Sequence, residues 1–219
     1  MPASWDALFF DLDGTLADSV GLILDCYRHT MRAHLGAQLP DDLWMAGLGT
    51  PLDRQLAAFA RNDEERAEMV KTYRSYQLTV HDRMVAAFPG VADSLGRFRT
   101  DGVPLGVVTS KHREVTLRTL RVCGIENSFD FIITPEDVQR SKPDPEPVLT
   151  ALARVGGARP DRVLFVGDAP VDMQAGRAAG VRTAAALWGP FPHETLRRER
   201  PDYLVRVFSD LLELSPADR

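Results

Sequence analysis

Five short apolar runs, each bounded by polar residues or glycine, constrain the fold of this 219-residue chain more than any other feature. Unbroken apolar runs of three to five residues are typical of strands that are buried on both faces of a parallel sheet. We therefore expect five buried strands. They are Ala7 to Phe10, Leu105 to Val108, Phe131 to Ile133, Val163 to Val166 and Thr183 to Leu187.

Stretches with helical periodicity separate these runs. Glu114 to Val122 is followed closely by Gly124, and Val171 to Ala179 is followed directly by Gly180. Glycine at this place is typical of a helix end, because it adopts the left-handed conformation there at little cost. The alternation of strands and helices predicts an α/β fold with a doubly wound parallel sheet.

Residues 18–84 interrupt the alternation. This region has helical patterns broken by glycine and proline, and no convincing strand. We therefore expect a helical cap domain over 18–84, inserted into an α/β core domain formed by 1–17 and 85–219. Phe88 to Gly90 resembles a hinge back into the core, followed by a helix from Val91 to Arg99.

Composition narrows the class of protein. Hydrophobic residues make up 44% of the chain, which is enough for a full core. A formal net charge of −5 argues weakly against nucleic acid or an anionic membrane as the main partner. Met1 to Asp6 has no basic segment of the kind that begins a secretion signal, so we expect a cytoplasmic protein. Cys26 and Cys123 have no metal-binding spacing, and we expect buried free thiols.

Two carboxylates follow the first strand directly, in the segment Asp11 to Thr15. Open α/β sheets bind ligands at the carboxyl ends of their strands, so both acids belong to a candidate site. One carboxylate can attack phosphorus, and the other can protonate the leaving oxygen and later activate water. Gly14 allows a sharp turn whose N–H groups can face a phosphate. Asp and Gly are also ordinary turn residues, which is the structural alternative.

Complementary groups follow three further strands. Thr109 and Ser110 offer hydroxyl and backbone donors for a phosphoryl oxygen, and Lys142 offers a positive charge. Asp168 ends another strand, with Asp172 four residues later. Mg²⁺ prefers oxygen ligands and commonly takes one or two carboxylates together with substrate and water. Each residue has a structural alternative as a helix cap or a solvated charge. Their occurrence at successive strand ends favours a site.

Taken in order, these residues resemble the four motifs of the haloacid dehalogenase superfamily of hydrolases, most of which are phosphatases. The motifs are Asp11 to Thr15, then Thr109, then Lys142, then Gly167 and Asp168 with Asp172. The resemblance covers nearly the whole chain and implies Mg²⁺ as cofactor. It also implies that Asp11 is the nucleophile.

The same resemblance assigns the other roles. Asp13 would be the acid and base and would offer its backbone carbonyl to a metal held by Asp11 and Asp168. Asp172 would support the site and Lys142. Gly14, Thr15, Thr109, Ser110 and Lys142 would hold phosphate. Members of the family that remove halogen lack an acid at the position of Asp13, so its presence favours phosphate esters.

The helical insertion after the first motif matches the subfamily with an α-helical cap. Gly47 to Leu52 is similar to a cap segment of phosphoglycolate phosphatases and of a related pyrophosphatase. Gly47, Gly49, Thr50 and Lys111 are therefore candidates for substrate specificity. A simple turn with Pro51 at a helix start is the structural alternative for the cap segment. The fourth motif departs from the family pattern at Ala169 and Pro170, where polar residues are common.

The resemblance implies a Mg²⁺-dependent phosphohydrolase that acts on a small phosphorylated metabolite. The expected substrate is a phosphate monoester, with 2-phosphoglycolate first and inorganic pyrophosphate second. A phosphomutase, which passes the phosphoryl group to another hydroxyl, is an alternative of a different class, and a binding protein with a decayed site is another. The sequence leaves a monomer and a homodimer equally open.

Overall fold

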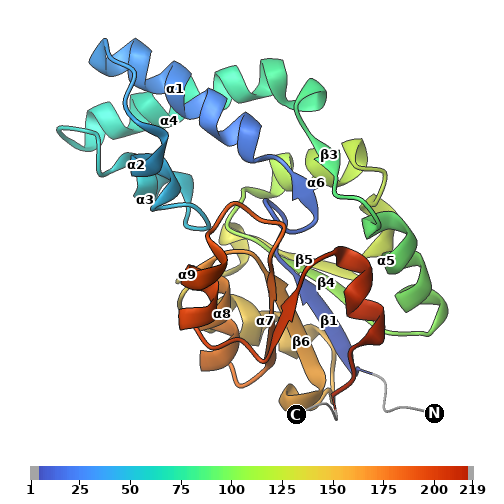
Figure 1. The fold of residues 1–219 in the computed structure, drawn as a ribbon. Coiled ribbons are helices and arrows are strands. Elements are labelled where there is room, and N and C mark those ends of the chain that lie inside the picture. The colour runs from blue at the N-terminus through green and yellow to red at the C-terminus, as the bar shows by residue number, and fades with distance from the viewer. Residues whose placement is uncertain (1–4, 217–219) are drawn as a thin grey trace.

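A parallel six-stranded sheet forms the centre of the computed structural model, which describes residues 5–216 (Figure 1). The strand order is β5-β4-β1-β6-β7-β8, and every neighbouring pair is parallel. The predicted fold class is therefore confirmed. Two short ranges lie outside the described residues. One is 1–4, where no secretion signal was expected, and the other is 217–219, the end of the predicted core domain. The strands are β1 (Ala7–Phe10), β4 (Leu105–Val108), β5 (Phe131–Ile133), β6 (Val163–Gly167), β7 (Arg182–Ala186) and β8 (Tyr203–Val205).

Helices cover both faces of this sheet. Because side chains alternate along β1, Ala7 and Phe9 pack in one apolar cluster while Leu8 and Phe10 pack in another. Helices α7 and α8 contact the first face, and α5 lies with the C-terminal turn η5 on the other. The core helices are α5 (Val91–Thr100), α6 (Arg113–Val122), α7 (Glu146–Arg154), α8 (Pro170–Ala178) and α9 (His193–Arg198). The 3₁₀ turns are η1 (His81–Arg83), η2 (Glu126–Ser128), η3 (Pro135–Asp137), η4 (Pro160–Arg162) and η5 (Phe208–Glu213).

The predicted helix ends agree with the structure. Gly124 follows α6 with φ 69°, and Gly180 follows α8 with φ 78°. Both values lie in the left-handed region, where glycine avoids the strain that a β-carbon causes.

Four helices stand above the carboxyl ends of the strands (Figure 1). They pack around an aromatic cluster in which the rings of Tyr27 and Trp44 stack with centroids 4.5 Å apart, and Trp44 stacks on Tyr73 at 6.0 Å. This aromatic packing of the four helices on one another supports the proposal that residues 18–84 are a cap domain. The helices are α1 (Val20–Leu35), α2 (Asp41–Met45), α3 (Leu52–Leu56) and α4 (Asp63–Val80).

A two-stranded antiparallel ribbon joins the two parts of the chain. Strand β2 (Ala17–Asp18) leads toward the cap helices, and β3 (Ala86–Ala87) leads back from them. The sequence did not predict either strand, because two residues are too few to show a period. The ribbon places both crossings between cap and core side by side, where one hinge can serve both.

Among residues 5–216, no helix combines the length and the apolar character that a membrane crossing needs.

Candidate active site

The turn after β1 positions the first motif. The Leu12 carbonyl accepts hydrogen bonds from the backbone N–H groups of Thr15, Leu16 and Ala17. Gly14 has φ 84°, and a β-carbon added there would lie 2.4 Å from Asp168 Oδ2. The turn therefore requires glycine for both its conformation and its space.

Lys142 is the centre of a buried charge cluster. Its Nζ lies 3.0 Å from Asp11 Oδ1 and 2.6 Å from Asp172 Oδ1, and it donates to the Val108 carbonyl at 3.2 Å. The Lys142 side chain is 1% exposed. The turn after β1, the end of β4 and helix α8 thus meet at Lys142, which lies in the segment before α7.

Asp168 and Asp172 are held by the start of α8. Thr15 donates its hydroxyl to Asp168 Oδ1 at 2.7 Å, and Asp172 accepts the N–H of Ala169 at 3.0 Å. Pro170 is the first residue of α8, a position where proline costs no hydrogen bond. The departure at Ala169 and Pro170 therefore leaves this helix start intact.

Burial governs the electrostatics of the cluster. Burial raises the pKa of Asp11 to about 7, although the Lys142 charge opposes this shift. Burial and the neighbouring Asp11 carboxylate also raise the pKa of Asp168. For Lys142, burial alone would lower the pKa, but the Asp11 and Asp172 carboxylates raise it above its usual range. Three carboxylates and one ammonium leave the cluster short of positive charge.

The donor set fits a divalent cation. One carboxylate oxygen from each of Asp11, Asp168 and Asp172 lies within 4.8 Å of the others. Hard cations such as Mg²⁺ bind carboxylate oxygens, and a divalent charge would offset the excess of buried acids. The predicted carboxylates Asp11 and Asp168 are both in this group. Both carboxylate oxygens of Asp172 already have partners, Oδ1 in Lys142 and Oδ2 in the N–H of Ala169, so Asp11 and Asp168 remain the better pair of ligands.

The Asp13 side chain is directed away from this group. Its Oδ1 accepts from the Ser19 hydroxyl and from Lys111 Nζ, the latter at 2.5 Å. Asp13 is partly exposed, whereas the Lys111 side chain is only 7% exposed. Asp11 and Asp13 therefore point into different surroundings, which is what separate roles as nucleophile and as acid and base require.

Thr109 and Ser110 follow β4 at the same edge of the sheet. The Thr109 hydroxyl accepts the N–H of Lys111 at 3.2 Å, and Thr109 is 6% exposed. The Ser110 hydroxyl donates to the Gly49 carbonyl at 2.7 Å. Ser110, expected to bind phosphate, thus joins the core to the cap here, and phosphate binding by it stays a prediction.

The cap segment Gly47 to Leu52 lies against the core. Gly49 has φ 89°, and a β-carbon there would lie 2.9 Å from Val171 Cγ2. Within the segment, the Thr50 hydroxyl donates to the Gly47 carbonyl at 2.6 Å. The structure therefore brings Gly49 and Thr50 to the cavity that is also lined by Asp11 and Lys111. Gly47 contributes to this segment by accepting the hydrogen bond from Thr50.

One cavity connects the core motifs with the cap. At the core end it is lined by Asp11, Asp13, Thr109 and Asp168. At the cap end it is lined by the predicted Gly49 and Thr50 and by further residues that the sequence analysis did not select. Tyr73 and Gln77 are four residues apart on α4, a spacing that places them on one helix face. That spacing is the signal that the sequence offered for these two residues. The polar and aromatic cap-end residues missed are Trp44, Gln55, Tyr73, Arg74 and Gln77.

Comparison with known proteins identifies the family. The profile of haloacid dehalogenase-like hydrolases matches residues 8–186, which is most of the chain. The chain belongs to the haloacid dehalogenase-like hydrolase family. The expected enzyme class, a phosphohydrolase, is confirmed with it.

Individual relatives agree with this assignment. The pyrophosphatase PpaX of Bacillus velezensis is 36% identical, with 95% of each chain covered. A haloacid dehalogenase-like family hydrolase from Streptococcus pneumoniae is similar in structure, with TM-score 0.80, 28% identity, and coverage of 94% of this chain and 96% of that one. A predicted phosphoglycolate phosphatase from Haemophilus somnus shares the fold, with TM-score 0.87, 23% identity, and coverage of 95% and 97%.

Proposed function

We propose that the protein is a Mg²⁺-dependent phosphatase that acts through a phosphorylated Asp11. The observation that carries this proposal is the buried pair of Asp11 and Lys142 at the carboxyl end of β1, with Nζ 3.0 Å from Oδ1. A carboxylate is a nucleophile only when it is ionised, and the adjacent ammonium favours its ionised form against burial.

In the first step, an Asp11 carboxylate oxygen forms a bond to phosphorus as the bond from phosphorus to the leaving oxygen breaks. Asp13, in its protonated form, gives its proton to that leaving oxygen. In the second step, Asp13 takes a proton from water, whose oxygen attacks phosphorus and breaks the bond to Asp11. Inorganic phosphate leaves. Proton transfer of this kind contributes about 10²–10⁴-fold to a rate.

Asp11 and Asp168, with the Asp13 carbonyl proposed beside them, would hold Mg²⁺, which when bound supplies positive charge against the phosphoryl oxygens. Lys142 contributes a further positive charge beside Asp11. Thr109 has a buried hydroxyl at the neighbouring strand end and is our candidate for holding a phosphoryl oxygen.

The proposed substrate is a small phosphorylated molecule. Inorganic pyrophosphate is now the first choice, because a relative with 36% identity over 95% of the chain is named a pyrophosphatase. 2-Phosphoglycolate, our expectation from sequence, becomes the second choice, since the structural neighbour with that name shares only 23% identity.

The test is phosphate release from a panel of pyrophosphate, 2-phosphoglycolate, sugar phosphates and nucleotides, with Mg²⁺ or with EDTA. We expect release from pyrophosphate or 2-phosphoglycolate that requires Mg²⁺ and is lost in Asp11→Asn. Equal release by wild type and Asp11→Asn would contradict the proposal. Interconversion of sugar phosphates without release of phosphate would instead identify a phosphomutase.

A further inference from the structure

The cap end of the cavity carries a positive charge that no acid neutralises. Arg74 of α4 lines the cavity together with Asp11 and Lys111. Lys111 is paired with Asp13, but Arg74 forms no ion pair with any of residues 5–216. A guanidinium that faces a substrate cavity without a carboxylate partner is suited to a carboxylate or phosphate of the ligand.

Among residues 5–216, the one side chain within hydrogen-bond distance of the Arg74 guanidinium leaves its charge intact. Nη2 of Arg74 lies against Nε2 of His112, whose Nδ1 is 2.8 Å from Glu136 Oε1. Since a carboxylate accepts, Nδ1 carries the proton and Nε2 accepts from Arg74. The imidazole is then neutral and orients the guanidinium from the core side.

Further hydrogen-bonding groups without a protein partner lie on the same wall. Gln77 is 6% exposed and lines the cavity, and its side-chain amide has no hydrogen-bond partner among the described residues. Trp44 is 1% exposed, also lines the cavity, and has an unpaired Nε1–H. Buried polar groups are nearly always satisfied, so the unpaired indole N–H of Trp44 points to an oxygen acceptor of a ligand, and the amide N–H of Gln77 can donate to the same ligand.

We propose that Arg74, Gln77 and Trp44 form a subsite for a second anionic group of the substrate, and that Arg74 is its specificity-determining residue. This inference rests on the proposed function and deepens it. While Asp11 takes the reacting phosphoryl group at the core end, the cap end would take a phosphate or carboxylate attached to it. Pyrophosphate and 2-phosphoglycolate both have such a group, and simple phosphate esters do not.

The experiment compares substrates with and without the second anionic group. In Arg74→Gln we expect kcat/KM to fall about 10- to 100-fold for pyrophosphate and 2-phosphoglycolate, the effect of a lost charge-assisted hydrogen bond, mainly through KM. Phenyl phosphate should be hydrolysed as by wild type, and Arg74→Lys should recover part of the loss. An equal loss with all three substrates would overturn the subsite and leave Arg74 a support for the cap.

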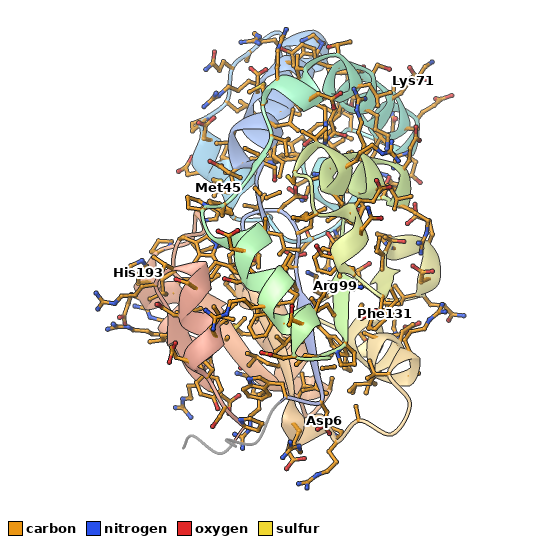
Figure 2. All side chains as sticks on the ribbon, turned by 90° about the vertical axis from the view of Figure 1, so that its right-hand side faces the viewer. Asp6, Met45, Lys71, Arg99, Phe131 and His193 are labelled. Atoms are coloured by element: carbon orange, nitrogen blue, oxygen red, sulfur yellow. The ribbon has the colours of Figure 1, made fainter. Side chains whose placement is uncertain are left out.

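The matched control is Lys71→Gln, one turn earlier on the same helix. Lys71 projects outward from the cap (Figure 2), and its side chain is 74% exposed. This variant removes the same charge from α4 without reaching the cavity. It should therefore leave the ratio of kcat/KM between pyrophosphate and phenyl phosphate unchanged.

A binding measurement separates this inference from the proposed function. Calorimetry with Mg²⁺ should show that wild type binds methylenediphosphonate more tightly than methylphosphonate, and that Arg74→Gln loses this difference. No preference in wild type, or a preference that persists in Arg74→Gln, would overturn the subsite. Neither ligand is hydrolysed, so this binding test does not depend on catalysis. Absence of turnover in every assay would contradict the proposed function, and the binding test could still be evaluated.

Discussion

One buried lysine lies among three buried carboxylates at the end of β1. Lys142 contacts both Asp11 and Asp172, and its side chain is almost fully buried. Burial of charge is costly, and the cost is offset only when every charge has a partner. The ammonium is therefore a structural requirement of the site as well as the proposed partner of the nucleophile.

Replacement of this lysine should lower the stability of the whole protein. In Lys142→Met, Asp11 and Asp172 lose their shared cation, and breaking a buried pair costs about 3–5 kcal/mol. We expect a decrease of that order in the free energy of unfolding, measured by urea denaturation without metal at pH 8.

The double variant Lys142→Met, Asp172→Asn is the control, because it removes one of the two carboxylates that lose their cation in Lys142→Met. It should be more stable than Lys142→Met alone. A Lys142→Met protein as stable as wild type would show that the carboxylates do not depend on this ammonium.

At the scale of elements, the cap segment and the start of α8 are in van der Waals contact. Gly49 approaches Val171 and Ala169 so closely that a β-carbon would lie 2.9 and 3.0 Å from their side chains. Ser110 adds a hydrogen bond to the Gly49 carbonyl. The cap is thus in contact with the core beside the proposed nucleophile, as a closed lid would be.

Gly49→Ala should hold this contact open. The added methyl meets Val171, and the left-handed φ of 89° is strained for alanine. We expect KM for the substrate to rise, with a melting temperature that falls by only a few degrees because the loss is about 1 kcal/mol.

Gly47→Ala serves as the control in the same segment. A β-carbon at Gly47 would lie 3.3 Å from Cγ of Gln55, a flexible side chain that can move. Its KM should stay near that of wild type. If the two alanine variants behaved alike, the close approach of Gly49 to α8 would have no part in substrate binding.

The central strands were predictable because they are buried on both faces. Ala7–Phe10 and Leu105–Val108 contain only residues of the core, so their apolar runs end where the strands end. Strands β2 and β3 were not predictable, since a strand of two residues is too short to show a pattern. Their pairing depends on the chain returning from the cap to the same place.

The site was predictable where its residues follow strands. Asp11, Thr109 and Asp168 each come directly after an apolar run, and a parallel sheet brings such ends together. Arg74 and Gln77 were missed for the opposite reason. They lie within a long helix, and their approach to the cavity depends on how that helix packs over the sheet.

At the scale of the whole molecule, polar contacts beside the hinge join cap and core. His81, at the end of α4, contacts the Thr119 hydroxyl of α6 through Nε2 at 2.9 Å. The adjacent Asp82 forms a hydrogen-bonded ion pair with Arg118 of α6, with Arg118 Nε 2.7 Å from Oδ1. These bonds couple the cap to the core independently of the cavity.

The ion pair predicts a dependence of stability on pH. The Arg118 hydrogen bond, with His81 in second place, lowers the pKa of Asp82 to about 2. A carboxyl with a lowered folded-state pKa stabilises the fold above its unfolded pKa of about 3.9, and this stabilisation disappears as pH falls toward the folded value. The melting temperature of Asp82→Asn should therefore be below that of wild type at pH 6, and the gap should narrow from about pH 4 downward.

Arg118→Gln removes the other partner of the same ion pair. Its difference in melting temperature from wild type should also become smaller as pH falls. A difference between Asp82→Asn and wild type that is constant from pH 6 to pH 3 would contradict the account. The Asp82 side chain is 55% exposed, so added salt should also reduce the gap.

The central claim is that Asp11 becomes phosphorylated, and chemical trapping tests it most directly. The enzyme is mixed with substrate and Mg²⁺, quenched rapidly in acid and treated with borohydride, which reduces an acyl phosphate to an alcohol and turns that aspartate into homoserine. Peptide mass spectrometry then locates the change. We predict homoserine at position 11 in wild type exposed to substrate, and none without substrate or in Asp11→Asn. Homoserine at position 13, or steady phosphate release with Asp11 never modified, would contradict the claim.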